Sequence, residues 1–204
     1  MMFEVPFGIP SEPQALGCIN WPDAFPQKPD VCFSIWHDGA SLHLRYVVIE
    51  PTVRAEEGTP GNFVYKDSCV EFFFQPKPGD PHYYNFEWNP LGTLYLAWRT
   101  GRDDAELAPP EVLSLVKAKG SLGSVPFTER EAEGPWTLEI EIPAKALWHS
   151  GIESFTGLSS RANFYKCGDG LTVPHYITWA PIDTPRPDYH RPEFFAPVTF
   201  APAG

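Results

Sequence analysis

The stretch FVYKDSCVEFFF, residues 63–74, decides the fold, because an apolar strand pattern is interrupted there by acidic side chains. Alternation with a period of two places Val70, Phe72 and Phe74 on one face of a strand and Glu71 on the other. Three large apolar side chains on one face indicate a strand that packs into a core. The acidic side chains therefore point away from that core, and the face that carries them needs its own explanation.

Similar alternation recurs through the chain and indicates a protein built from many short strands. The 24 prolines and 16 glycines are spread almost evenly, which favours turns over long helices. This pattern is typical of an antiparallel β-sandwich, in which each sheet buries one face and leaves the other wet. Besides residues 69–75, we expect strands within 31–36, 41–48, 83–89, 93–98, 113–118, 137–143, 161–167, 176–181 and 197–200.

One short helix is expected at residues 143–150, PAKALWHS. Pro143 suits the first turn of a helix, and Gly151 suits the position after its end. No linker divides the chain, so we interpret residues 1–204 as a single all-β domain with one or two short helices. Loops are expected at 56–62, 77–80, 99–111 and 167–174.

Charge and composition disfavour several classes of partner. The net charge of −11 repels a phosphate backbone, so we expect no nucleic-acid partner. No apolar run of about 18 residues occurs, so we expect no membrane-spanning segment. The N-terminal MMFEVPFGIP lacks the basic and apolar regions of a secretion signal. A cytoplasmic protein and a mature secreted form both stay open.

The four cysteines, Cys18, Cys32, Cys69 and Cys167, are widely spaced and form no CxxC motif. This spacing disfavours a zinc site. We expect four buried free thiols. One disulfide stays open, because strands that are distant in the sequence can be neighbours in a sheet.

The faces opposite the predicted core carry an unusual set of side chains for a solvated sheet. Carboxylate and guanidinium groups can bind two neighbouring hydroxyls, and aromatic rings offer an apolar surface to a sugar ring. If these strands share a sheet, their polar side chains form a face suited to a sugar; if they do not, each face is simply solvated. The side chains are Glu71, Gln75, Tyr83, Asn85, Glu87, Asn89, Arg161, Asn163 and Tyr165.

Five sequence blocks resemble the family 9 carbohydrate-binding modules, and more closely the free-standing family 9-like proteins. The blocks occur in the expected order and cover roughly residues 20–200. The resemblance implies an antiparallel sandwich of the DOMON-like or jelly-roll-like type and a protein that binds carbohydrate without catalysis. The blocks are VYKDSCVEFFFQP, YYNFEWNPLGT, WTLEIEIP, RANFYKCGDG and PDYHRPEFFAPVTF.

The resemblance also implies a site in which two aromatic rings enclose a sugar. Its first ring aligns with Tyr65, before the strand, and its second with Tyr189, in the C-terminal block. The family acid aligns with Glu71, but a family arginine that binds sugar hydroxyls falls at Glu87, which reverses the charge of that contact. The extra residue in DSCVE also shifts Asp67 relative to the family pattern. The predicted sugar-binding residues are Tyr65, Asp67, Glu71, Asn85, Glu87, Arg161, Asn163, Tyr189 and His190.

Some family 9 modules carry structural calcium, so the resemblance raises the same question for this chain. The acidic cluster in a predicted loop consists of Asp103, Asp104 and Glu106. Its spacing matches no EF-hand loop. We interpret it as a solvated loop and expect no cofactor.

Two other functions stay open at this point. Glu71 and Glu87 on adjacent strands could form the carboxyl pair of a glycoside hydrolase. Haem binding, which occurs in some DOMON-like domains, is disfavoured, because the only methionines are Met1 and Met2 and the six histidines are scattered. The expected partners are a carbohydrate ligand and, for a free-standing module, a separate glycan-degrading enzyme.

Overall fold

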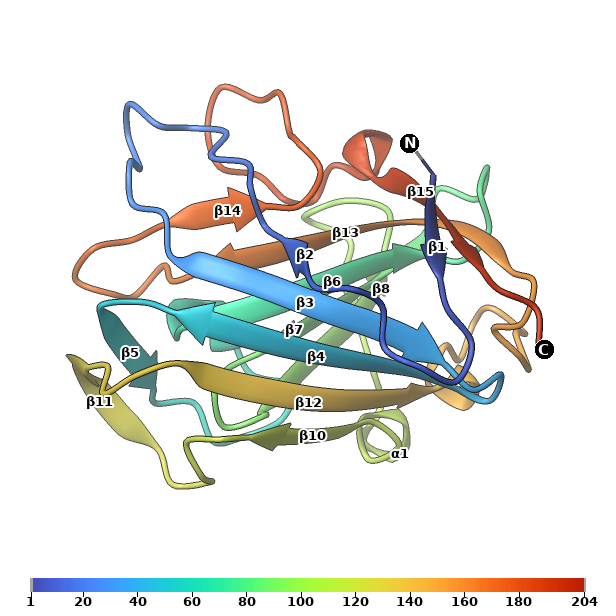
Figure 1. Cartoon of the computed structure of the whole chain (residues 1–204), viewed down its shortest axis with the longest axis horizontal. Coiled ribbons are helices and arrows are strands. Elements are labelled where there is room, and N and C mark those ends of the chain that lie inside the picture. The colour runs from blue at the N-terminus through green and yellow to red at the C-terminus, as the bar shows by residue number, and fades with distance from the viewer. Residues whose placement is uncertain (1, 204) are drawn as a thin grey trace.

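The computed structural model describes residues 2–203, which form two facing sheets and a small third one (Figure 1). The larger sheet contains, in spatial order, β1 (Phe3–Val5), β15 (Ala196–Phe200), β13 (Ser159–Cys167), β6 (Cys69–Gln75), β7 (Tyr83–Trp88), β8 (Leu94–Arg99) and β9 (Glu106–Leu107), with β14 (Tyr176–Thr178) also paired to β13.

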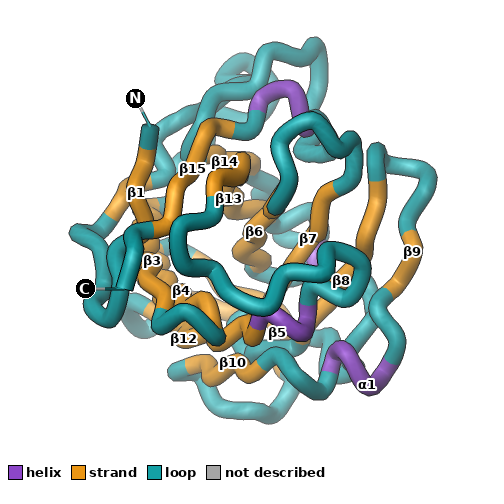
Figure 2. The backbone as a smooth tube through the Cα atoms, turned by 90° about the vertical axis from the view of Figure 1, so that its right-hand side faces the viewer, coloured by secondary structure: helices purple, strands orange, loops and turns teal. Residues whose placement is uncertain are grey.

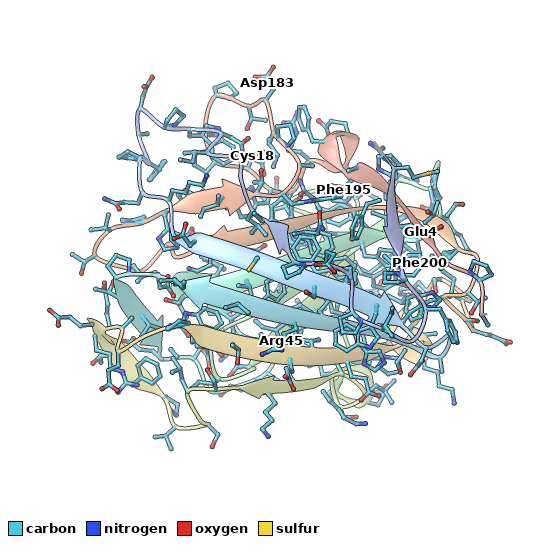
Figure 3. The ribbon with its side chains drawn as sticks, viewed as in Figure 1. Glu4, Cys18, Arg45, Asp183, Phe195 and Phe200 are labelled. Carbon is cyan, nitrogen blue, oxygen red and sulfur yellow. The ribbon has the colours of Figure 1, made fainter. Side chains whose placement is uncertain are left out.

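The smaller sheet packs against the inner face of the larger one, and Figure 2 shows the two rows of strands end-on. It contains β10 (Lys117–Gly120), β12 (Trp136–Pro143), β4 (Ser41–Ile49), β3 (Asp30–His37) and β2 (Gln14–Ala15). A separate pair is formed by β5 (Thr52–Ala55) and β11 (Phe127–Glu131). The pairings between these strands are antiparallel, apart from the parallel pairing of β1 with β15. In Figure 3, the labels Glu4 on β1 and Phe200 on β15 mark these two strands. The predicted antiparallel β-sandwich is therefore confirmed.

The core between the sheets consists of the apolar side chains that the alternation places inward. Val70, Phe72 and Phe74 are all buried there. Phe164 on β13 stacks on Phe33 of the opposite sheet, with ring centroids 3.7 Å apart. Truncating a buried phenylalanine to alanine typically costs about 3–5 kcal/mol, so these rings hold the larger sheet firmly in place.

The opposite face of the larger sheet is not a solvated surface, and here the sequence-based expectation was wrong. All side chains of β6 and β7 are buried, on both faces. A second apolar cluster covers the outer face, and it includes Phe73 of β6, Tyr165 of β13 and Phe195 of the C-terminal segment. The larger sheet is therefore the middle layer of the molecule.

The cover over the outer face comes from two segments that are far apart in the sequence. Trp21 Nε1 donates a hydrogen bond to the Thr184 carbonyl oxygen at 2.7 Å, and the Ile182 N–H donates to Asn20 Oδ1 at 3.0 Å. Cys18 on one segment and Asp183 on the other are labelled near the same edge in Figure 3. These contacts close the loop after β14 over the sheet.

The predicted helix at 143–150 was wrong, because only a 3₁₀ helix forms, at Ala144–Ala146. Pro143 still belongs to β12, and hydrogen bonds from Leu147 to Ala144 and from Ser150 to Leu147 span three residues rather than four. The other 3₁₀ helices are Val64–Lys66 and Pro192–Phe194. No helix within the described residues is long and apolar enough to cross a membrane.

The predicted strand at 113–118 was wrong over most of its length. Pro110 starts a short α-helix, α1 (Pro110–Leu113), because proline is favoured in the first helical turn. Strand β10 begins only at Lys117. The strand predicted at residues 69–75 is confirmed as β6, and Phe63, which precedes it, is 59% exposed.

Candidate functional site

A row of four side chains crosses the outer face of the larger sheet. Glu71 on β6 lies opposite Tyr165 on β13 and opposite Glu87 on β7, and Glu87 lies opposite Tyr95 on β8. The buried apolar residues on the inner face fix the register of each strand, so the polar residues of the outer face are fixed with it. The sheet therefore places two carboxyl groups side by side between two phenol rings.

A cavity of about 450 Å³ lies over this row, which is within the usual size range of small-molecule sites. Five of the nine predicted site residues line it: Tyr65, Glu71, Glu87, Tyr189 and His190. They come from the segment before β6, from β6 and β7, and from the C-terminal segment. The fold thus brings together residues from the first and the last of the quoted blocks.

The two carboxyl groups at the floor of the cavity are both buried. Burial raises the pKa of Glu87 to about 7, against the opposing effect of a hydrogen bond from Asn85 Nδ2 to Glu87 Oε1 at 2.9 Å. Burial, followed by the charge of Glu87, raises the pKa of Glu71 well above its ordinary value. Oε2 of Glu87 has no hydrogen-bond partner among the described residues. Near neutral pH the pair can therefore both donate and accept hydrogen bonds.

A buried guanidinium completes the polar part of the cavity. Arg99 at the end of β8 donates from Nη2 to the Tyr95 hydroxyl at 2.8 Å and from Nη1 to the Arg102 carbonyl oxygen at 3.2 Å. Its Nε has no hydrogen-bond partner within residues 2–203. The sequence interpretation missed Arg99 and Tyr95. Alternation places both on the face of β8 that lies next to Glu87. The interpretation also missed the lining residues Phe63, Arg102, Asp169 and Tyr176.

The aromatic walls of the cavity differ in how much of each ring is free. Tyr65 is half-buried, and exposed Phe63 lies beside it with ring centroids 5.7 Å apart. Tyr189 is only 7% exposed, because one face of its ring stacks on Tyr165 at 4.2 Å and its hydroxyl donates to the Lys166 carbonyl oxygen at 3.0 Å. Tyr65 and Tyr189 nevertheless lie on the same side of the sandwich and line the same cavity.

His190 is the one histidine of six that lines the cavity in the described part of the chain. Its Nδ1 lies 3.0 Å from the Tyr83 hydroxyl. Burial first, and then the positive charge of Arg99, lowers the pKa of His190. The ring is therefore neutral at physiological pH and contributes hydrogen bonding rather than charge.

Asp67 does not line the cavity, although the pattern places it beside the site. Its carboxylate accepts hydrogen bonds from the backbone N–H groups of Glu56 and Glu57, both at 2.9 Å, and from Asn89 Nδ2 at 3.0 Å. Arg54 Nε lies 3.4 Å away. These contacts hold residues 56 and 57 against the segment that precedes β6, so the carboxylate of Asp67 has a structural role.

Of the three remaining predicted residues, Asn163 and Arg161 hold backbone segments in place, and Asn85 binds the Glu87 carboxyl group. The Asn163 side chain donates to the Ala180 carbonyl oxygen at 3.1 Å and accepts a hydrogen bond from the Ala180 N–H at 2.9 Å. Strand β14 ends at Thr178, so this amide takes the place of backbone pairing just beyond the strand. Arg161 Nη2 donates to the Phe195 carbonyl oxygen at 2.6 Å. Asn85 is fully buried and donates to Glu87. None of these three lines the cavity within the described residues.

The acidic loop does not fit calcium, which requires six to eight converging oxygen ligands. The Asp104 carboxylate already accepts from the N–H groups of Thr100 and Gly101, both at 2.9 Å. Glu106 instead contacts His149 Nε2 at 2.7 Å. These carboxylates point to different partners. The four cysteines are all free thiols, with only Cys69 and Cys167 fully buried.

Comparisons with known proteins agree with this architecture. The model of a family described as carbohydrate-binding family 9 matches residues 10–200. A Bacteroides uniformis protein described as a candidate carbohydrate-binding protein, with a crystal structure at 2.70 Å resolution, is 38% identical over 98% of this chain and 97% of that chain, with a TM-score of 0.90. No curated protein sequence matched the chain.

Two more distant structures contain a family 9 carbohydrate-binding module from Caldicellulosiruptor kristjanssonii. In its complex with glucose, the module is 13% identical in sequence to this chain. The match covers 100% of this chain and 97% of the module, with a TM-score of 0.64. The complex with cellotriose is 12% identical, with coverages of 100% and 95% and a TM-score of 0.60. At these identities the similarity establishes the fold alone.

Proposed function

The chain belongs to carbohydrate-binding family 9, and from that premise we propose that it is a non-catalytic protein that holds a sugar in the cavity over the larger sheet. The observation that carries this proposal is the composition of the cavity, which combines the carboxyl pair Glu71 and Glu87 with the Arg99 guanidinium and aromatic walls. Sugars present closely spaced hydroxyl groups and apolar C–H faces, and this combination meets both.

The polar contacts are assigned to the floor of the cavity. The Glu87 carboxyl group and the Arg99 guanidinium, which both line the cavity, supply an acceptor and a donor for neighbouring hydroxyls. Glu71 adds a second carboxyl group on the adjacent strand. Because an apolar ligand would desolvate these polar groups without offering them hydrogen bonds, the floor of the cavity favours a polyhydroxylated ligand over an apolar one.

The aromatic contacts are assigned to Tyr65 and Tyr189, which enclose the sugar. Tyr65 offers the more open ring, next to exposed Phe63 at the mouth of the cavity. Tyr189 offers the inner wall, held rigidly by its stack on Tyr165. The glucose and cellotriose complexes of the distant family 9 module support glucose and short glucans as the first ligands to test. A separate glycan-degrading enzyme is the proposed partner.

A second candidate function, glycoside hydrolysis, is favoured by one observation. Glu71 and Glu87 are direct cross-strand partners with raised pKa values, and retaining and inverting hydrolases use carboxyl pairs about 5–9.5 Å apart. Family membership favours binding over hydrolysis, so catalysis is kept as the alternative.

The proposed function is tested by a glycan array followed by calorimetry with glucose, cellobiose, cellotriose and each array hit. We expect saturable binding that Glu87→Gln weakens by roughly tenfold to a hundredfold, since one charge-assisted contact is worth about 1.5–3 kcal/mol. Glu139→Gln is the matched control, because Glu139 is an exposed glutamate of β12 in the other sheet. Absence of binding to every sugar, or equal loss in both variants, would overturn the proposal.

A further inference from the structure

Two buried thiols and a carboxyl group converge at one end of the cavity floor. Cys69 on β6 lies directly opposite Cys167 on β13, and Glu71 follows Cys69 by two residues on the same face of β6. Cys167 Sγ lies 3.1 Å from Glu71 Oε1, and the potential ligand atoms of all three residues lie within 4.8 Å of one another. Within residues 2–203, this is the one group of three such side chains that converges in this way.

The donor set and its spacing suit a thiophilic cation. In tetrahedral zinc sites the metal–sulfur distance is about 2.3 Å and the metal–oxygen distance about 2.0 Å, so the donor atoms lie roughly 3.5–3.8 Å apart. The three side chains are already near that spacing and need only small side-chain movements to reach it. Cys167 and Glu71 also line the cavity, so a fourth coordination position would face its interior.

Two guanidinium groups line the same cavity as the cluster, but each has another partner: Arg99 donates to the Tyr95 hydroxyl and Arg102 pairs with Asp188. No salt bridge of Glu71 or Glu87 to a lysine, arginine or histidine occurs among the described residues. The nearby ammonium of Lys166 points to the inner face of β13, where it contacts Glu50 at 2.9 Å. Two adjacent carboxyl groups and two thiols thus share a buried region, and a divalent cation would balance the charge of their ionised forms.

We propose that Cys69, Glu71 and Cys167 form a binding site for a thiophilic divalent cation of the zinc class, with the fourth position open to the cavity. Binding exchanges the two thiol protons for two metal–sulfur bonds, and the protons pass to the solvent, so no oxidant takes part. The metal site shares Glu71 and the cavity with the proposed sugar site, but metal binding does not require a sugar, so the two proposals can fail separately. The spacing of the cysteines in the sequence argued against zinc, and it is the register of these two strands that brings two of them together.

The test uses the full chain, reduced with a phosphine and dialysed against Zn²⁺, with bound zinc counted by elemental analysis. We expect about one zinc per chain in the wild type. Replacing zinc by Co²⁺ is expected to give thiolate-to-metal charge-transfer absorption in the near ultraviolet. Cys32→Ser is the matched control, because Cys32 lies on β3 in the other sheet, and it is expected to leave both readouts unchanged.

Cys69→Ser and Cys167→Ser are each expected to abolish the charge-transfer band or to weaken zinc binding by at least tenfold. Glu71→Gln is expected to weaken zinc binding while leaving cobalt–thiolate absorption detectable at high metal concentration. Circular dichroism and the melting temperature verify that each variant folds, and serine is close enough in size to keep the packing. No stoichiometric zinc in the wild type, or wild-type affinity in either cysteine variant, would overturn the proposal.

Discussion

Glu71 on β6 and Glu87 on β7 are direct cross-strand partners, and both carboxyl groups are buried at the floor of the same cavity. Burial disfavours their charged forms, so both pKa values are raised. Between the ordinary value of 4.5 and about 7, the folded protein holds more protons at Glu87 than the unfolded chain does. The free energy of unfolding therefore decreases as pH rises through this window.

Glu87→Gln removes this titration. We expect the variant to be more stable than the wild type at pH 8, by on the order of 2 kcal/mol, and nearly equal to it at pH 4.5. Scanning calorimetry across this pH range measures the difference, which corresponds to roughly 4–8 °C in Tm. A difference that does not change with pH would contradict the raised pKa of Glu87.

Tyr65→Ala is expected to weaken sugar binding by about tenfold while leaving Tm nearly unchanged, because the ring is half-buried and offers its free face to the cavity. Calorimetric titration with the best array ligand measures the loss. Trp36→Ala provides a control with an aromatic residue of the other sheet, whose ring stacks on His43. Unchanged affinity in Tyr65→Ala, or unfolding of that variant, would remove Tyr65 from the site.

Tyr189 is expected to matter for stability as well as for binding. Tyr189→Ala removes a ring that stacks on Tyr165 and should lower the free energy of unfolding by about 3–5 kcal/mol. Tyr189→Phe loses only the hydroxyl that donates to the Lys166 carbonyl oxygen and should cost about 1 kcal/mol. Denaturant unfolding compares the two variants, and equal costs would show that the stack contributes little.

Lys166 is buried in the core, where its ammonium lies 2.9 Å from Glu50 Oε2 and 2.6 Å from His175 Nε2. Lys166→Met would leave the Glu50 carboxylate buried without a cation, and we expect a loss of about 3–5 kcal/mol. The double variant Glu50→Gln with Lys166→Met should recover part of this loss in the same denaturant experiment. A double variant that is less stable than Lys166→Met alone would argue against this account.

The purified protein is expected to hydrolyse neither aryl glycosides nor plant polysaccharides. Release of reducing sugars over a pH range from 4 to 8 is the measurement. If hydrolysis were observed and then abolished by Glu71→Gln or Glu87→Gln, the hydrolase alternative would replace the binding function.

The inner faces of the strands were predictable, because side-chain direction in a strand is a local property with a period of two. Val70, Phe72 and Phe74 lie in the core as the alternation requires, and Lys166 also points inward with Ala162 and Phe164. The segment 143–150 was not predictable in this way. Its apolar residues fit a helix, but only the packing after β12 decides that a 3₁₀ helix forms there.

The candidate site was predictable only in part. Alternation and the family resemblance led to Glu71, Glu87 and Tyr65, since each is set by its position relative to one strand. Asn163 has the expected orientation, but its amide is engaged by Ala180, a partner that alternation cannot reveal. Arg99 could have been predicted by the same alternation. It lies on the same face of β8 as Tyr95, which pairs with Glu87.

The sequence by itself determined the longer strands, the apolar faces that bind the two sheets together and the family to which the chain belongs, because these depend on local periodicity and on ordered motifs. Only the tertiary structure decided that the second face of the larger sheet is covered by Trp21, Phe195 and their neighbours rather than exposed to water. It also decided that Cys167 meets Glu71 across 96 positions of sequence. The physical reason is that the register between β6 and β13 depends on how the whole core packs, and no short stretch of the chain encodes it.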